Sequence, residues 1–189
     1  MPFENYKQKP SIAVVYTGNS KGKTSASIGL MCRALGRGWR VAYIQFIKEW
    51  EVGEHAFIRK IQPVFGEQLY FYKGGKGFFD AGDLSAQDIS EADHTHAARE
   101  TFNQALHCAT NGKFDLIICD EINNAAHDGL IDKDDIKKLL TERGQNVSLC
   151  LTGRHFPKEL LPMIDIATEM AKIKHHFDEQ FLAKEGIDY

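Results

Sequence analysis

The sequence predicts an α/β fold built on a mainly parallel sheet of about six strands flanked by helices. Six apolar, β-rich runs alternate with longer segments, several of which have the periodicity of helices. A glycine- and lysine-rich loop joins the first run to a helical pattern, which is the setting of a phosphate-binding loop. The chain has 189 residues, of which 43% are hydrophobic, so it can bury a sizeable core. We expect a single domain over 1–189, with residues 1–10 as a short N-terminal arm.

The predicted strands and the first helix follow one another in the order expected of such a sheet. The strands span residues 12–16, 41–47, 68–72, 114–119, 147–152 and 167–173. The first helix follows the loop and ends at Gly36, because glycine is the preferred residue at the end of a helix. The apolar residues that give it a helical pattern are Ile28, Leu30, Met31, Ala34 and Leu35.

Three further helices are predicted from capping residues and periodicity. Ser85 and Asp88 form a weak capping box that opens a long helix, whose histidines we expect on the outer face. Another helix begins at Asp132 or Lys133 and extends through 140, and a third covers 157–164 with Pro157 in its first turn. The residues of the long helix expected to face the sheet are Ala92, Ala97, Ala98, Phe102, Ala105 and Leu106.

The loop at 16–25 has the sequence Tyr-Thr-Gly-Asn-Ser-Lys-Gly-Lys-Thr-Ser and is the strongest functional motif. In a phosphate-binding loop, backbone N–H groups and a helix N-terminus point at phosphate oxygens. Lys23 adds a mobile positive charge, and the Thr24 hydroxyl is suited to Mg²⁺. The strict pattern requires glycine at position 17, where this chain has Thr17, so the orientation of the nucleotide stays open. The alternative is a turn with a solvated lysine.

Two further polar groups follow predicted strands. Asp120 and Glu121 end a buried strand, as expected of a strand beside the phosphate loop that delivers an acid to Mg²⁺. Arg154 follows the next strand, where its planar guanidinium can reach phosphate oxygens, because ligands of open α/β sheets bind outside the carboxyl ends of the strands. The alternatives are solvated or capping carboxylates and an ordinary surface arginine.

Aromatic, cysteine and histidine residues carry weaker signals. The segment 70–80 combines aromatics with glycines, so Phe78 either faces a cofactor or plugs the core. The four cysteines contain no Cys-x-x-Cys pair, and we expect them in the core of a protein from a reducing compartment. The eight histidines form no zinc-binding array.

Composition bounds the partners and the location. The net charge is −3 and long blocks of like charge are absent from the sequence, so nucleic-acid binding is not indicated. Residues 1–10 lack the apolar core of a signal peptide, and no apolar run reaches the length of a membrane span. We therefore expect a cytoplasmic protein that binds neither nucleic acid nor a membrane.

The loop at 16–25 is accompanied by further motifs in a fixed order. They are Arg-Ala-Leu-Gly-Arg-Gly at 33–38, Gln-Phe-Ile-Lys at 45–48, Gly-Glu at 53–54, Gly-Phe at 77–78, Asp-Glu-Ile-Asn at 120–123 and Leu-Thr-Gly-Arg at 151–154. The ending, from His175 and His176 to Gly-Ile-Asp-Tyr at 186–189, belongs to the same pattern. From Ser11 onward the chain resembles the P-loop ATP:corrinoid adenosyltransferases.

The resemblance implies a RecA-like P-loop fold and a reaction. The family transfers the 5′-deoxyadenosyl group of ATP to Co(I) of a corrinoid and releases triphosphate. ATP is bound in reverse, with the γ-phosphate where the α-phosphate usually lies, and the missing glycine at position 17 fits that departure. The implied substrates are ATP and a reduced corrinoid, with Mg²⁺ as cofactor, a flavoprotein reductase as a possible partner and a homodimer as the assembly.

The resemblance also implies roles for individual residues. Lys23 and Arg154 neutralise the triphosphate, Thr24 and Glu121 hold Mg²⁺ with Asp120 as the competing ligand, and Phe78 stands at the corrinoid face. The implied ATP-binding loop consists of Gly18, Asn19, Ser20, Lys21, Gly22, Lys23, Thr24 and Ser25. Ser20 replaces a glycine usual in the family, and Phe79-Asp80 replaces the Thr-Trp that follows this Phe in better-known members.

Three other functions are compatible with the motifs. One is a P-loop ATPase or phosphotransferase, the second is a non-catalytic ATP- or corrinoid-binding homologue, and the third is a structural or assembly partner. The sequence leaves open whether the corrinoid is a complete cobalamin or a precursor.

Overall fold

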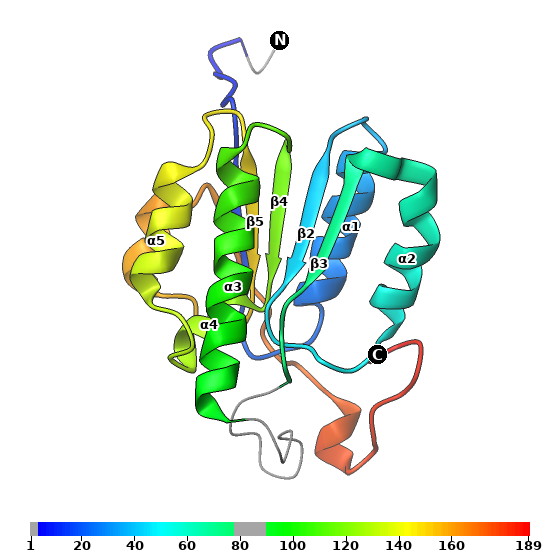
Figure 1. The fold of residues 1–189 in the computed structure, drawn as a ribbon. Coiled ribbons are helices and arrows are strands. Elements are labelled where there is room, and N and C mark those ends of the chain that lie inside the picture. The colour runs from blue at the N-terminus through cyan, green and yellow to red at the C-terminus, as the bar shows by residue number, and fades with distance from the viewer. Residues whose placement is uncertain (1–3, 78–89) are drawn as a thin grey trace.

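The protein forms one sheet of six parallel strands. The structure, a computed structural model, describes residues 4–77 and 90–189. The strand order is β3-β2-β4-β5-β1-β6, and every neighbouring pair is parallel (Figure 1). The strands are β1 (Ala13–Thr17), β2 (Val41–Gln45), β3 (Leu69–Lys73), β4 (Leu116–Asp120), β5 (Ser148–Thr152) and β6 (Ile166–Glu169). Each overlaps its predicted range and exceeds it by at most one residue, so the predicted fold class is confirmed.

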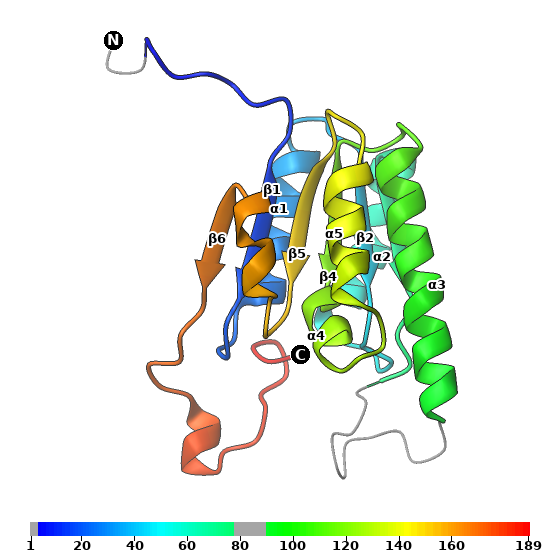
Figure 2. The ribbon, with the colours of Figure 1, turned by 90° about the vertical axis from the view of Figure 1, so that its left-hand side faces the viewer.

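Helices cover both faces of the sheet. α1 (Lys23–Leu35) and α2 (Gly53–Phe65) pack on one face, and α3 (Glu91–Thr110) and α5 (Lys133–Glu142) pack on the other. The short helix α4 (Ile122–His127) follows β4. In the described part of the chain, 3₁₀-helices lie at η1 (Gly66–Gln68), η3 (Lys158–Met163) and η4 (His176–Glu179). Figure 2 shows β6 as an edge strand next to β1, with the chain after it continuing below the sheet.

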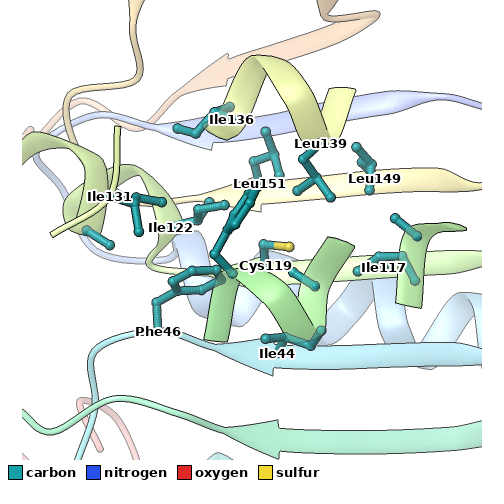
Figure 3. Packing of buried hydrophobic residues seen from close by; sticks show 14 of the residues in the cluster. Ile44, Phe46, Ile117, Cys119, Ile122, Ile131, Ile136, Leu139, Leu149 and Leu151 are labelled. Atoms are coloured by element: carbon teal, nitrogen blue, oxygen red, sulfur yellow. The ribbon is translucent and has the colours of Figure 1, made fainter. Parts of the chain in front are cut away.

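Alternation along the strands divides the core between the two faces. On one face Tyr43 and Ile118 pack with Met31 of α1, and on the other Ile44 and Leu149 pack with the helices α3 and α5 (Figure 3). Successive side chains of a strand point to opposite faces. The same alternation therefore places the last residues of β2, β4 and β5, which are Gln45, Asp120 and Thr152, on the face that carries α1 and α2.

Three predictions about exposure are wrong. Cys32 was expected in the core but is exposed, because it follows the buried Met31 by one residue and so lies about 100° further around α1. On α3, His94 is buried and Ala92 is exposed, the reverse of the expectation. The buried stripe of α3 begins at His94 and continues at Ala97 and Ala98 with helical spacing, and Ala92 lies off that stripe.

The predicted helix at 157–164 is also different in kind. It is the 3₁₀-helix η3, with Pro157 as its N-cap rather than in its first turn. Pro162 lies inside it and has no N–H to donate, which disfavours a longer α-helix. By contrast, α5 begins at Lys133 with Asp132 as N-cap, as predicted.

Some predictions concern residues outside those described. Ser85 and Asp88, the expected capping box, and the segment Phe78-Phe79-Asp80 belong to this group. Within the described part α3 starts at Glu91, and the Ser90 hydroxyl accepts a hydrogen bond from the Asp93 N–H as a helix cap. No helix in residues 4–77 or 90–189 is long and apolar enough to cross a membrane.

Candidate functional site

The phosphate loop lies at the carboxyl end of β1, between that strand and α1 (Figure 1). Gly18 and Gly22 have φ angles of 99° and 111°, which favour glycine, and Gly22 is the N-cap of α1. The non-glycine residues with positive φ in the described chain are Glu121, His155 and Gln180. Thr17 and Ser20 therefore adopt ordinary backbone angles. The two positions where this loop departs from glycine do not require glycine.

Lys23 folds back over the loop. Its side chain is buried, and its Nζ donates hydrogen bonds to the carbonyl oxygens of Gly18, at 2.9 Å, and Ser20, at 2.6 Å. Burial lowers the pKa of Lys23 from its ordinary value. Asn19 and Ser25 are exposed. The ammonium group is thus held inside the curve of the loop, where an anion bound by the loop would meet it.

Asp120 connects the acid-bearing strand to the loop. Its carboxylate accepts hydrogen bonds from the hydroxyl of Thr24, at 3.1 Å, from the hydroxyl of Thr152, at 2.7 Å, and from Nε2 of Gln45, at 2.9 Å. The strand that carries Asp120 ends beside the phosphate loop, as predicted, although β5 lies between β4 and β1 in the sheet. The Asp120 carboxylate nevertheless reaches the Thr24 hydroxyl, since both lie on the α1 face of the sheet.

Glu121 turns the chain from β4 into α4. Its φ is 63°, a left-handed conformation uncommon for a residue with a side chain, and its N–H donates to the hydroxyl of Thr152 at 2.9 Å. Burial and the adjacent Asp120 raise the pKa of the Glu121 carboxyl to about 7, against the opposing effects of Lys48, Lys23 and Arg154. Strain of this kind is concentrated at functional sites.

Arg154 is placed by the loop after β5. Its backbone N–H donates to Oδ1 of Asn124 at 2.6 Å, and Nδ2 of Asn123 donates to the Gly153 carbonyl at 3.2 Å. Gly153 has a φ of 127°, and a Cβ at that position would lie only 2.5 Å from Oδ1 of Asn124. These contacts fix the backbone of Arg154 against the start of α4, while the residue itself is exposed.

The oxygen atoms at this site fit a hard cation. Mg²⁺ in nucleotide sites is bound through one or two carboxylates together with hydroxyl, phosphate and water oxygens. Thr24, Asp120 and Glu121 supply a hydroxyl and two carboxylates from two neighbouring segments. Among the described residues, no three His, Cys, Asp or Glu side chains converge to hold a metal on their own.

Sequence reasoning missed the segments that cover the loop. The Met170 carbonyl accepts from the N–H of Ser20 at 3.0 Å, and Nζ of Lys21 pairs with Asp188 at 2.8 Å. Tyr189 lies against Gly53 at the start of α2, since a Cβ on Gly53 would be 3.6 Å from the carbonyl carbon of Tyr189. These contacts are long-range in sequence, so no local pattern could have predicted them.

The segment after β2 adds a second cation near the acids. Lys48 pairs with Glu54 at 2.6 Å, and both side chains are mostly buried. Burial opposes the charged form of Lys48, but Asp120 and Glu54 outweigh it and raise the Lys48 pKa. The sequence shows Gln45 and Lys48 as polar residues near the end of a buried strand, but it predicts no role for either of them.

Of the predicted site residues, the structure brings together Lys23, Thr24, Asp120 and Glu121. Lys23 and Arg154 both influence the pKa of Glu121, so Arg154 also borders the same site. Phe78, the predicted corrinoid-facing residue, lies outside the described residues.

Comparison with known proteins identifies related sequences and folds. The family model described as "ATP:corrinoid adenosyltransferase BtuR/CobO/CobP" matches residues 9–189. The chain is 32% identical to the corrinoid adenosyltransferase of Escherichia coli (strain K12) over 179 residues, which cover 94% of this chain and 85% of that protein. It is 30% identical to the corrinoid adenosyltransferase of Pseudomonas aeruginosa over 184 residues, covering 97% and 86%.

A solved structure shares the fold at much lower identity. A KaiC-like protein from Pyrococcus horikoshii superposes with a TM-score of 0.52 and 11% identity, covering 88% of this chain and 75% of that one. Such a likeness concerns the fold alone. Together with the strand order, it supports the RecA-like P-loop class.

Proposed function

The chain belongs to the ATP:corrinoid adenosyltransferase family, and from this premise we propose how its site at the carboxyl end of the sheet works. The reaction moves the 5′-deoxyadenosyl group from ATP to Co(I) of a corrinoid and leaves triphosphate. Reduced cobalt is itself the nucleophile, so the protein needs no nucleophilic side chain. It must align the reactants, stabilise the triphosphate that departs and keep the cobalt face accessible.

The observation that carries the site assignment is the contact between Thr24 and Asp120. These residues are far apart in sequence, yet the hydroxyl and the carboxylate lie 3.1 Å apart at the loop. A phosphate loop joined to an acid-bearing strand is the arrangement that binds a nucleotide triphosphate with a divalent cation. We assign the triphosphate to the loop from Gly18 to Ser25.

The chain's own residues have distinct tasks in this proposal. Lys23, now bonded to loop carbonyls, exchanges those partners for phosphate oxygens, and Arg154 reaches the same anion from the β5 side. Charge on the departing triphosphate is thereby balanced by two fixed cations in a partly buried site. Thr24, Glu121 and Asp120 would hold Mg²⁺, which when bound neutralises phosphate charge. Phe78 is proposed to face the corrinoid, on the basis of the family resemblance.

Three further proposals concern the surroundings of the reaction. We propose a cytoplasmic homodimer, as the family resemblance implies, and sedimentation velocity at several protein concentrations tests the dimer. Co(I) forms only when the cobalt of the corrinoid gains electrons, and it is a strong reductant that is readily reoxidised. A flavoprotein reductase that reduces the cobalt is therefore the proposed electron source. Whether the acceptor is complete cobalamin or a precursor is decided by comparing rates with the two.

An absorbance assay tests the proposed function. The protein is incubated with ATP, Mg²⁺ and chemically reduced cobalamin, and the spectrum is followed for formation of an alkylated cobalt centre. We expect the change to require all three components. A protein that binds ATP but leaves the reduced cobalamin spectrum unchanged would contradict the proposal.

A further inference from the structure

A buried chain of polar side chains connects Asp120 to helix α2. Asp120, Gln45 and His55 each have 0% of their surface exposed. Gln45 and Asp120 are register partners in the β2–β4 pairing, and Nε2 of Gln45 donates to Oδ2 of Asp120 at 2.9 Å. The other end of the Gln45 amide, Oε1, contacts Nε2 of His55. This row of hydrogen-bonded side chains thus extends from Asp120 at the phosphate loop to His55 in the first turn of α2.

The two ends of this chain fix the direction of every hydrogen bond in it. The backbone N–H of Val52 donates to Nδ1 of His55 at 3.3 Å, so Nδ1 is an acceptor and the neutral ring carries its hydrogen on Nε2. At the other end, the Asp120 carboxylate only accepts, so the amide NH₂ of Gln45 must face it. The amide oxygen then faces His55 and accepts from Nε2. Burial lowers the pKa of His55, which favours the neutral ring that this pattern needs.

Packing alone does not explain these residues. Each occupies a fully buried position where an apolar side chain would avoid the free-energy cost of desolvating an amide or an imidazole. Neighbouring positions on the same strand face, such as Val41 and Tyr43, pack in the apolar layer with α1. Gln45 is the last residue of β2 and lies opposite Asp120, the last residue of β4, while His55 contacts Gln45 from α2. The position of Gln45 and His55 is therefore explained by their link to Asp120 and not by packing in the apolar core.

The geometry points to His55 and Gln45 as positioning residues for the metal and phosphate site. Gln45 donates to Oδ2 of Asp120, and Thr152 donates to Oδ1. Together these two hydrogen bonds fix the orientation of the carboxylate that accepts from the Thr24 hydroxyl. His55 in turn sets the orientation of the Gln45 amide. Outer partners of this kind orient metal-binding carboxylates, and their loss reduces metal affinity by roughly 10–100-fold. This inference rests on the proposed function.

A pair of substitutions at His55 separates positioning from packing. Asparagine retains a polar group near the position of Nδ1, facing Val52, but cannot reach Gln45. Glutamine places an amide near the position of Nε2 and can still donate to Gln45. His55→Asn should therefore lose the hydrogen bond that orients the Gln45 amide, and His55→Gln should keep it. Gln45→Met, which has a similar length and no hydrogen-bonding amide, removes the contact to Asp120 directly.

The quantity to measure is the metal requirement of ATP binding, determined by calorimetry at a series of Mg²⁺ concentrations. Mn²⁺ binding in the presence of ATP, measured by electron paramagnetic resonance, is the independent check. We expect Gln45→Met and His55→Asn to raise the half-saturating metal concentration about tenfold or more, and His55→Gln to stay within about threefold of the parent. ATP affinity in EDTA should be unchanged. Ile44→Val, on the opposite face of β2, is the control that loosens packing without touching the polar chain.

The outcomes are distinguishable. Equal metal requirements in the parent, Gln45→Met and His55→Asn, with only the unfolding temperature reduced, would overturn the inference. If Gln45→Met does not fold, the contrast between His55→Asn and His55→Gln decides: equal behaviour of these two variants overturns it. A parent protein that binds ATP with no metal requirement would instead overturn the proposed metal site, and this inference with it.

Discussion

Lys23 is buried against the carbonyl oxygens of its own loop, where its ammonium group would meet a bound phosphate. Lys23→Ala removes a charge-assisted contact worth about 1.5–3 kcal/mol. We therefore expect the Kd for MgATP, measured by calorimetry, to rise roughly ten- to a hundredfold. Lys113→Ala, an exposed lysine just before β4 at the opposite end of the sheet, is the matched control. Unchanged affinity in Lys23→Ala would show that the loop does not bind the triphosphate.

Asp120 and Glu121 differ in ways that a substitution can separate. Asp120 is held by Thr24, Thr152 and Gln45, whereas Glu121 lies at the left-handed turn into α4. Glu121→Gln keeps the shape but removes an anionic oxygen that a hard cation prefers. We expect a higher Mg²⁺ requirement in this variant. The unfolding temperature without metal should be at least as high as that of the parent, because the raised pKa of Glu121 means that its charged form is disfavoured in the fold. An unaltered Mg²⁺ titration in Glu121→Gln, with a shifted one in Asp120→Asn, would transfer the ligand role to Asp120.

Phe78 carries a prediction that rests on the family resemblance. An aromatic side chain at the corrinoid face acts by excluding water or a lower ligand from cobalt. Phe78→Ala should therefore slow formation of the cobalt–carbon bond more than it weakens ATP binding. The rate is measured with a mild physiological electron donor, because strong chemical reduction bypasses the step. A full rate under those conditions would assign Phe78 to the core.

The C-terminal segment is tied to the phosphate loop through Asp188. Its carboxylate pairs with Lys21 at 2.8 Å and accepts from the Lys184 N–H at 2.7 Å, and the hydrogen bond to Lys21 is the main reason that its pKa falls to about 2. A lowered folded-state pKa means that the pair stabilises the docked segment above pH 4 or so and loses that effect as pH falls toward 2.

Removing this carboxylate should release the segment from the loop. In Asp188→Asn we expect faster amide hydrogen exchange over residues 170–189 at neutral pH, with little change in the sheet. Asp178→Asn is the matched control, because Asp178 pairs with Lys172 within the same segment and not with the loop. If both variants exchange like the parent, Asp188 does not anchor the segment.

Helices and strands were predictable where the local sequence carries a clear apolar run or cap, and were missed where such signals are absent. Strand positions followed from apolar runs, and α5 from its Asp132 cap. Helix α2 was not predicted: its N-cap is Val52, whose N–H is bound by the His55 side chain, and Pro63 lies within its last turn. Helix α4 has only six residues and begins from the left-handed Glu121. Neither helix carries the usual capping signals.

The site shows the same division. Lys23, Thr24, Asp120 and Glu121 were predicted because each belongs to a motif that follows a strand. Gln45 was quoted as part of a motif, but its role depends on the register Gln45–Asp120, which only pairing of β2 with β4 reveals. The insertion of β5 between β4 and β1 likewise depends on topology and not on local sequence.

Across the whole molecule, we propose that residues 1–189 form one cooperative domain. Both apolar layers share the strands β2, β4 and β5, so loss of one face exposes the other. Trp39 lies just after α1 and Trp50 just before α2. We expect tryptophan fluorescence and far-ultraviolet circular dichroism to report the same urea midpoint. Two separate midpoints would show independently unfolding units.

The central claim is that the whole triphosphate leaves when ATP reacts with reduced cobalt. The most direct test is to identify the phosphate products by phosphorus NMR after turnover with MgATP and chemically reduced cobalamin, with Lys23→Ala as the impaired control. Attack at C5′ predicts inorganic triphosphate in equal amount to the new cobalt–carbon bond. ADP and inorganic phosphate, formed without alkylation of cobalt, would contradict the account and identify an ATPase.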